Sequence, residues 1–243
     1  MIIAASNVTT LFLLNALSFI PVIVSLLLIR SHELHSQVPS SQKRDKPQKT
    51  WQSLREGLAY VWSTPEIILM VLVVGLVLLF GSNFNVILPL FATDRLHVGA
   101  SGFGFLSAAA GIGALLAALW LAWSNQPATP RSVLLGMLAF GILEIAFSFS
   151  PIYILSLLLI ASIGFSEELF AMRAMTTLQT ITPEHLTGRV TSVQVLFFDG
   201  SLPLGYLLMG WLSATFGAPH AMLTGALLSL LIAAAAWLWW RKT

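Results

Sequence analysis

The chain lacks cysteine and has few charged side chains. Without cysteine it can form no disulfide, no thiol nucleophile and no thiolate metal site. Charged residues make up 9% of its 243 residues, whereas an ordinary globular domain has about 25%. Hydrophobic residues make up 57%, so the composition excludes a soluble globular fold and makes the lipid bilayer the expected partner.

Seven long apolar stretches, separated by shorter polar breaks, account for most of the sequence. The hydrocarbon core of a bilayer is about 30 Å thick, and a helix needs about 20 mostly apolar residues to cross it. We therefore expect an all-α polytopic membrane protein. Its seven transmembrane helices are predicted at about residues 8–29, 67–91, 103–123, 133–149, 152–177, 190–212 and 218–240.

The basic residues occupy alternate breaks between these spans. Ten lie on one side of the predicted topology: Arg30, Lys43, Arg44, Lys46, Lys49, Arg55, Arg131, Arg189, Arg241 and Lys242. Only Arg95 lies in an opposite loop, and Arg173 falls inside a span. Because Lys and Arg concentrate in cytoplasmic loops, we expect a multi-pass protein of the plasma or inner membrane with a cytoplasmic C-terminus. Since the basic residues form no single patch, nucleic acid is not an expected partner.

One long polar break, residues 31–64, separates the first two spans. It begins with a run of Ser, Gln, Lys and Pro that cannot bury enough apolar surface to order itself. Its second half changes character, because apolar residues recur there at helical spacing opposite polar ones, which predicts a short helix in the cytoplasmic interface. Thr64 and Pro65 then suit the N-cap and first position of the next helix.

Two spans carry residues that disturb or tighten helix packing. Gly81, Asn83, Asn85 and Pro89 fall in the outer half of the second span, which indicates either a helix broken beside a wet cavity or a proline kink packed on its neighbours. In the third span, small residues at four-residue spacing permit close helix approach; they are Ala109, Gly113 and Ala117, with Gly104 and Ala108 on a related stripe. Ser201 and Gly205 repeat this spacing in the sixth span.

Five ionisable side chains fall within the predicted spans: Glu144, Glu167, Glu168, Arg173 and Asp199. Each costs roughly 2.5 to 3.5 kcal/mol near the bilayer centre, so each requires a structural or functional reason. Four acids exceed one base, so some carboxyls are protonated, line water or meet charge from a missing partner. Either Arg173 forms a buried ion pair with a carboxylate on another helix, or at least one of Asp199, Glu167 and Glu168 titrates or faces substrate. Glu144 lies near the outer end of its span, where it could reach water.

The remaining polar residues give no catalytic or metal site. The five histidines, His32, His35, His97, His185 and His220, all fall in predicted loops without ligand spacing. No nucleophile elbow, phosphate-binding glycine loop or His-Glu metalloprotease motif is present. The sequence therefore predicts no enzyme activity, no metal and no cofactor, and a membrane-embedded hydrolase using Glu and Asp is disfavoured.

Several stretches resemble exporters of the major facilitator superfamily. Residues 53–70, SLREGLAYVWSTPEIILM, resemble the central linker and the start of helix seven. Residues 87–118, ILPLFATDRLHVGASGFGFLSAAAGIGALLAA, resemble helix seven continuing into helix eight. Residues 182–217, TPEHLTGRVTSVQVLFFDGSLPLGYLLMGWLSATFG, are similar to the loop before helix eleven and to helix eleven itself. The likeness is greatest to the drug and siderophore branch, which includes enterobactin and macrolide exporters.

The resemblance implies that this chain carries helices six to twelve of a twelve-helix fold. Residues 15–19, NALSF, resemble helix six, so residues 1–30 would be its equivalent, 31–64 the linker and 65–243 the six-helix C-terminal bundle. Members of this superfamily hold substrate between two bundles that rock against each other. Two departures concern the cytoplasmic gate. The loop SNQPATPR keeps Arg131 alone of a usual basic cluster, and Thr187 stands where an arginine usually precedes Gly188 and Arg189.

These features favour the C-terminal part of a proton-coupled exporter of small amphipathic molecules that is inactive alone. Asp199, Glu167 or Glu168 would carry the proton, while Asn83, Phe84 and Asn85 would line an apolar substrate cavity. The alternative is a membrane interaction subunit, or a non-functional fragment of a split transporter. The expected partners are a small-molecule substrate and an N-terminal half-transporter chain or a second copy; the sequence does not name the substrate.

Overall fold

The computed structural model describes residues 13, 16–17, 19–28, 50–124 and 126–241, and the chain divides into two compact units, Met1–Gln48 and Lys49–Thr243. In the first unit the described helix is α3 (Ile20–Leu28). Residues 8–12, 14–15, 18 and 29 of the expected first span, 8–29, lie outside the described residues, as do the polar half of the expected linker, His32 and His35.

The second unit is a bundle of helices, which confirms the predicted all-α membrane class. Six helical segments of the described chain are long and apolar enough to cross a membrane: Pro65–Asp94, Ala100–Trp123, Pro130–Ser148, Tyr153–Ile181, Glu184–Phe216 and Ala218–Trp240. The first of these consists of α5 (Pro65–Gly81) and α6 (Phe84–Asp94). The fifth consists of α10 (Glu184–Phe198), a 3-10 turn η1 (Asp199–Ser201) and α11 (Leu202–Phe216).

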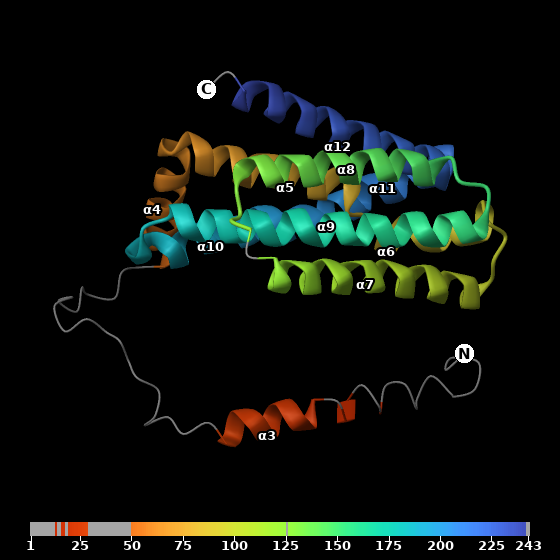
Figure 1. The fold of residues 1–243 in the computed structure, drawn as a ribbon, viewed down its shortest axis with the longest axis horizontal. Coiled ribbons are helices and arrows are strands. Elements are labelled where there is room, and N and C mark those ends of the chain that lie inside the picture. Colours follow the sequence, from red (N-terminus) through yellow and green to blue (C-terminus); the bar gives the residue numbers. More distant parts are fainter. Residues whose placement is uncertain (1–12, 14–15, 18, 29–49, 125, 242–243) are drawn as a thin grey trace. The chain divides into compact units, whose positions relative to one another are not determined.

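The spans run back and forth along one common direction (Figure 1). In the bundle α7 (Ala100–Trp123) packs on α9 (Tyr153–Ile181), α9 on α8 (Pro130–Ser148), α8 on α12 (Ala218–Trp240), and α12 on α5. Arg131 and Arg241 adjoin helix ends at one end of the bundle, and Arg95 follows α6 at the other. The bundle therefore keeps the separation of basic residues that the loop charges predict.

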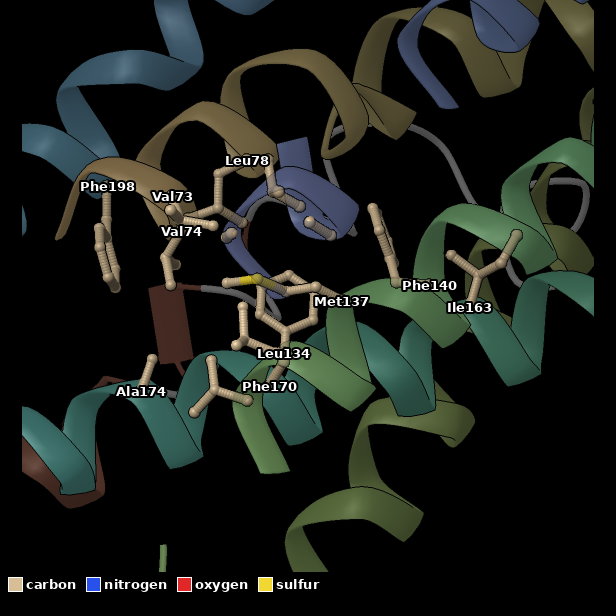
Figure 2. Close-up of a cluster of buried hydrophobic side chains, with 14 of the residues drawn as sticks. Val73, Val74, Leu78, Leu134, Met137, Phe140, Ile163, Phe170, Ala174 and Phe198 are labelled. Atoms are coloured by element: carbon tan, nitrogen blue, oxygen red, sulfur yellow. The ribbon is translucent and has the colours of Figure 1, made fainter. Parts of the chain in front are cut away.

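Large apolar side chains from α5, α8 and α9 fill the interior. Figure 2 shows Leu78 of α5 and Met137 of α8 facing one another beside Phe170 of α9. The Phe140 and Phe170 rings meet nearly edge to face, with centroids 5.4 Å apart. Such pairs add about 0.5–1.5 kcal/mol to the burial of the rings, so these contacts hold α8 against α9.

Of the two stripes of small residues on α7, the one that contains Gly113 packs against a neighbouring helix. A Cβ atom on Gly113 would overlap the Ala161 carbonyl oxygen of α9, and one on Gly164 would overlap the Ala110 carbonyl oxygen of α7. The two backbones therefore touch through reciprocal glycines, a packing mode that membrane helices favour. Gly104, on the second predicted stripe, is exposed, and a Cβ atom there would meet no neighbouring atom within 4 Å.

The expected irregularity of the first span of the bundle occurs earlier than Pro89. The helix stops after Gly81 and restarts at Phe84, while Pro89 remains inside α6. The Asn83 side-chain amide donates to the Leu79 carbonyl oxygen at 2.9 Å. This bond caps the end of α5, because it satisfies a carbonyl that the interruption leaves without a helical partner.

A second interruption, which the sequence did not predict, divides the span that ends in α11. The 3-10 turn Asp199–Ser201 joins α10 to α11, and Pro203 follows at the start of α11. Gly205 packs directly against the Leu79 backbone at the end of α5. The two interrupted spans therefore meet close to their breaks.

The amphipathic helix expected within 31–64 is present as α4 (Thr50–Ser63). It packs mainly on α10 and also on α5. Val61 is buried, whereas Trp62 is exposed, so the predicted apolar stripe is divided between the bundle and the surface. At the start of α5, Thr64 occupies the N-cap position and Pro65 the first turn, but the Thr64 side chain makes no capping hydrogen bond.

Candidate functional site

Polar side chains from four spans meet inside the bundle beside the break after α5. We call Ser82, Glu144, Glu167 and Ser229 the inner polar group. The Ser82 hydroxyl donates a hydrogen bond to Glu167 Oε1 of α9. Glu144 Oε2 of α8 lies beside Gly81, the residue that precedes Ser82. A Cβ atom on Gly81 would lie 3.0 Å from Glu144 Oε2 and 2.9 Å from Ser229 Oγ, so this glycine makes room for the group.

The position of Glu144 corrects the expectation that this side chain reaches water. Glu144 is only 1% exposed, and its Oε2 atom has no hydrogen-bond partner among the described residues. It lies one turn before the end of α8, yet the break after α5 and the adjacent α12 cover it. The prediction used only the position of Glu144 along its span. That position does not reveal which face of the helix its neighbours cover.

Sequence reasoning also missed the two hydroxyls of this group. Ser82 lies between Gly81 and Asn83, so the run of helix-disturbing residues was the available signal for it. Ser229 Oγ donates to the Val77 carbonyl oxygen of α5 at 3.4 Å. Its partner lies 152 residues away along the chain, and local sequence gives no indication of such a contact.

The three predicted cavity-lining residues point to different neighbours. Asn83 is fully buried and its Oδ1 atom has no hydrogen-bond partner in the described chain. Phe84 packs edge-on against Phe140, with ring centroids 6.4 Å apart. Asn85 is exposed, and its side-chain amide donates to the Tyr206 hydroxyl at 3.0 Å. Only Asn85 of the three therefore lies where a ligand outside the bundle could contact it, together with Tyr206, which the sequence did not single out.

Asp199 lies apart from the inner polar group. It opens the 3-10 turn between α10 and α11, and its side chain is exposed on the bundle surface. Because a carboxylate facing lipid at this depth is costly, the observed exposure indicates a polar environment or a covering partner on this face. Asp199 and Glu167, two candidates for the same role from the sequence, thus occupy different environments.

Glu168 and Arg173 line one pocket, although residues five apart are about 500° apart around a helix. The pocket lies between α7 and α9 and has a volume of about 320 Å³. Its lining residues are Ala118, Leu121, Gln126, Ala128, Glu168, Met172, Arg173 and Thr176.

Within the described chain, Arg173 forms none of the ion pairs that the sequence led us to expect, and its buried Nε atom has no hydrogen-bond partner. The carboxylates expected on other helices do not reach it, because the inner polar group and Asp199 lie elsewhere in the bundle. The pocket therefore contains both signs of charge, and the guanidinium retains donor capacity for a ligand.

The two predicted gate residues differ in their contacts. Arg189 of α10 forms an ion pair with Glu56 of α4. A Cβ atom on Gly57 would lie 2.9 Å from the Arg189 carbonyl oxygen, so the two helices also touch through their backbones. Arg131 is exposed in the first turn of α8. The helical spacing places Glu56 on the polar side of its helix but does not identify its partner.

The histidines that the structure describes, His97, His185 and His220, are all exposed. Within the same described ranges, no three His, Cys, Asp or Glu side chains lie close enough together to hold a metal ion. The polar side chains inside the spans are carboxyls, hydroxyls, amides and the Arg173 guanidinium, which can carry a proton or bind a polar ligand group.

Comparison with known proteins identifies a matching family and several related exporters. The chain matches the family model described as "Transmembrane secretion effector" over residues 1–241. It is 32% identical over 180 residues to the multidrug efflux pump Tap of Mycolicibacterium fortuitum, covering 73% of this chain and 43% of the pump. It is 32% identical over 181 residues to the enterobactin exporter EntS of Escherichia coli O81 (strain ED1a), covering 72% of this chain and 41% of the exporter.

The chain spans less than half the length of these curated relatives. No solved structure gives a significant match. The family match nevertheless extends over nearly every residue, and six apolar spans accompany it. The chain therefore belongs to the transmembrane secretion effector family, in the drug and siderophore exporter branch of the major facilitator superfamily.

Proposed function

We propose that the chain is the C-terminal portion of a proton-coupled secondary transporter that exports small amphipathic molecules. The observation that carries this proposal is the inner polar group, in which Glu144 and Glu167 both lie beside the break after α5, Glu144 next to Gly81 and Glu167 bonded to Ser82. The export direction and the amphipathic substrate class are supported by the names of the relatives, a multidrug efflux pump and an enterobactin exporter.

The inner polar group has the composition that a reversible proton site needs. Two neighbouring carboxylates repel one another when both are ionised, and one shared proton removes that repulsion. Ser82 supports one carboxyl, while Glu144 Oε2 remains without a partner in the described chain. Proton uptake would therefore change the charge at a helix break, and a break is a place where two spans can shift.

A complementary set of helices would complete this transporter, supplied by chain outside these residues or by a separate polypeptide. Asp199 supports this part of the proposal, since its exposed carboxyl lies within a membrane span. The pocket with Glu168 and Arg173 opens on α7, which buries little of its own surface in this bundle. Substrate would pass between the two sets, in contact with residues such as Asn85 and Tyr206.

The proposal also assigns the cytoplasmic gate and the orientation of the bundle in the membrane. Arg131 and Arg189 would lie at the cytoplasmic end, where Arg189 holds α4 to α10 through Glu56. The C-terminus after α12 would be cytoplasmic, because the basic residues gather at that end. Proton release would then occur toward Arg131 and Arg189, and substrate release toward the opposite end.

The experiment is efflux of a fluorescent cationic dye from an exporter-deficient strain. The chain is expressed alone and together with helices one to five of the efflux pump it resembles. We expect efflux only with the added helices, and loss of that efflux when a protonophore collapses the proton gradient. Efflux that survives the protonophore would overturn the proton coupling.

Substitutions then separate proton transfer from structure. Glu167→Gln and Glu144→Gln should abolish gradient-driven efflux but leave dye exchange without a gradient, since exchange needs substrate binding and no net proton movement. Glu184→Gln, an exposed carboxyl at the start of α10, serves as the control and should change neither. If the amides of Glu144, Glu167, Glu168 and Asp199 all retain gradient-driven efflux, the proton is carried elsewhere.

A second reading is supported by the exposed face of α7, where Phe105, Leu119 and Trp123 are among the uncovered large side chains. Under this alternative hypothesis the chain is a membrane interaction subunit, or a non-functional fragment of a split transporter. Confirmed membrane insertion with no efflux in either arm of the dye experiment would favour it.

A further inference from the structure

A cavity lies away from the inner polar group and is lined by residues from the starts of α5 and α8 and the end of α12. These three helix ends lie at the same end of the bundle (Figure 1). We call this cavity the end pocket. Its volume is about 740 Å³, which is within the usual range for sites that hold small organic ligands. Its lining residues are Thr64, Pro65, Glu66, Leu69, Met70, Pro130, Trp239 and Trp240.

The end pocket lies at the level where apolar spans give way to polar chain. Each of its three helices changes from an apolar span to a polar neighbourhood there, as Pro65, Pro130 and Trp240 are the terminal residues of those spans. Trp side chains concentrate at the interface between hydrocarbon and headgroups. Trp239 is 45% exposed, so its indole is available to a ligand at this level.

The lining combines one charge with a mostly apolar wall. Glu66 is the only charged residue among the lining residues, its side chain is exposed, and it forms no ion pair with any residue that the structure describes. Indole rings attract cations through their faces, and a carboxylate accepts charge-assisted hydrogen bonds from an ammonium group. Leu69 is partly exposed and offers apolar surface just inside the span, whereas Met70 is buried. A matching ligand therefore has an ammonium group next to an acyl chain.

We propose that the end pocket binds an aminophospholipid such as phosphatidylethanolamine. The ammonium group contacts Glu66 and the indole of Trp239, and the upper acyl chain lies along Leu69. Arg131, which is exposed, directly follows the lining residue Pro130 in the sequence. An anionic lipid without an amine would instead place its charge beside the Glu66 carboxylate.

A soluble amine with an apolar tail could bind in the same way, because it too has an ammonium group beside an apolar chain. The lipid is favoured because the pocket lies at headgroup level, where phosphatidylethanolamine is already present at high local concentration. The inference does not depend on proton coupling or on export, since it concerns a different face of the bundle.

Lipid retention by the full chain tests the proposal. The protein is placed in nanodiscs of phosphatidylglycerol with an equal part of either phosphatidylethanolamine or phosphatidylcholine, and lipid that stays bound after detergent extraction is counted by native mass spectrometry. We expect phosphatidylethanolamine to be retained about tenfold over phosphatidylcholine, because the trimethylated headgroup cannot donate to a carboxylate. Equal retention of both lipids overturns the proposal.

Two matched substitutions assign the preference to the end pocket. Glu66→Gln keeps side-chain size but removes the charge, and should reduce the preference to about onefold, as expected if one charge-assisted contact causes it. Glu184→Gln removes a carboxylate from the first turn of α10, outside the pocket, and should leave the preference intact. A preference that survives Glu66→Gln places the lipid elsewhere and overturns the assignment.

Competition with dodecylamine distinguishes the two sources of the ammonium group. If the lipid is the occupant, micromolar dodecylamine should fail to displace phosphatidylethanolamine from the unmodified chain in nanodiscs. If dodecylamine binds in a manner that depends on Glu66 and displaces the lipid, the end pocket takes a soluble amphiphile and the lipid proposal is wrong.

Discussion

Ser82 donates a hydrogen bond to Glu167 Oε1, joining the two-residue break after α5 to the middle of α9. The two residues are 85 positions apart in the sequence. The contact links a backbone irregularity to an intramembrane carboxyl, so a movement of one affects the environment of the other. Glu144 lies beside the same contact and is covered by the bundle.

The first prediction concerns the Ser82 hydroxyl. The bond from Ser82 to Glu167 is partly buried, and a hydrogen bond to a charged group contributes about 1.5–3 kcal/mol, less where water has access. We expect Ser82→Ala to slow gradient-driven dye efflux about tenfold, as a loss of roughly 1.4 kcal/mol implies, whereas Ser82→Thr keeps the hydroxyl and most of the rate. The measurement is dye efflux from cells that also express the missing helices.

Ser192→Ala is the control for Ser82. Its hydroxyl donates to the Gly188 carbonyl oxygen within α10 and is exposed, so its removal should leave efflux unchanged. Equal losses in Ser82→Ala and Ser82→Thr would contradict a role for the hydroxyl and indicate a packing effect instead.

The second prediction concerns the reciprocal glycines of α7 and α9. Gly113→Ala adds a Cβ atom that overlaps the Ala161 carbonyl oxygen, and overpacking of this kind costs about 1–3 kcal/mol. For a chain of this length that loss lowers the thermal midpoint by roughly 2–12 °C. Thermal unfolding of the purified chain in detergent, followed by circular dichroism, measures the shift.

Gly111→Ala on the same helix provides the comparison, because no atom lies within 4 Å of the added carbon. It should leave the midpoint unchanged or raise it slightly, since alanine favours a helix over glycine. If both substitutions shift the midpoint equally, the close approach of α7 to α9 does not determine stability.

The third prediction concerns the ion pair between Glu56 and Arg189. Both side chains are partly exposed, so their coupling should be only about 0.5–1 kcal/mol. A double-mutant cycle with Glu56→Gln, Arg189→Gln and the double substitution, followed by thermal unfolding, isolates that coupling. Arg131→Gln, at an exposed position in α8, should show no coupling to Glu56. Coupling near zero for Glu56 and Arg189 would mean that the backbone contact alone holds α4 to α10.

The fourth prediction uses the absence of native cysteine. A single cysteine can be placed at Gly99, Pro151 or His220, exposed positions that precede or open helices at one end of the bundle, or at Gln126 or Glu184, exposed positions at the other end. A membrane-impermeant maleimide added to intact cells should label the first set only, because the basic end is expected to be cytoplasmic. Labelling of the second set instead would reverse the topology.

Much of the fold is determined by the sequence itself. Hydropathy is a local property, so the positions of the six described spans agree with the predicted ranges to within a few residues at most boundaries. The distribution of Lys and Arg over the loops likewise predicted that Arg131 and Arg241 lie at the same end of the bundle. The helical spacing of apolar residues before Thr64 predicted α4 for the same local reason.

The tertiary structure alone decided the contacts that make the candidate site. Glu144 is buried because distant helices cover it. Arg173 lacks the expected ion pair with another helix because, within the described chain, only Glu168 of its own helix shares its pocket. Glu56 meets Arg189 across 133 residues. Hydropathy and periodicity report how one helix faces its surroundings, whereas these contacts depend on the rotation and depth of two helices relative to each other. That information appears only when the helices pack.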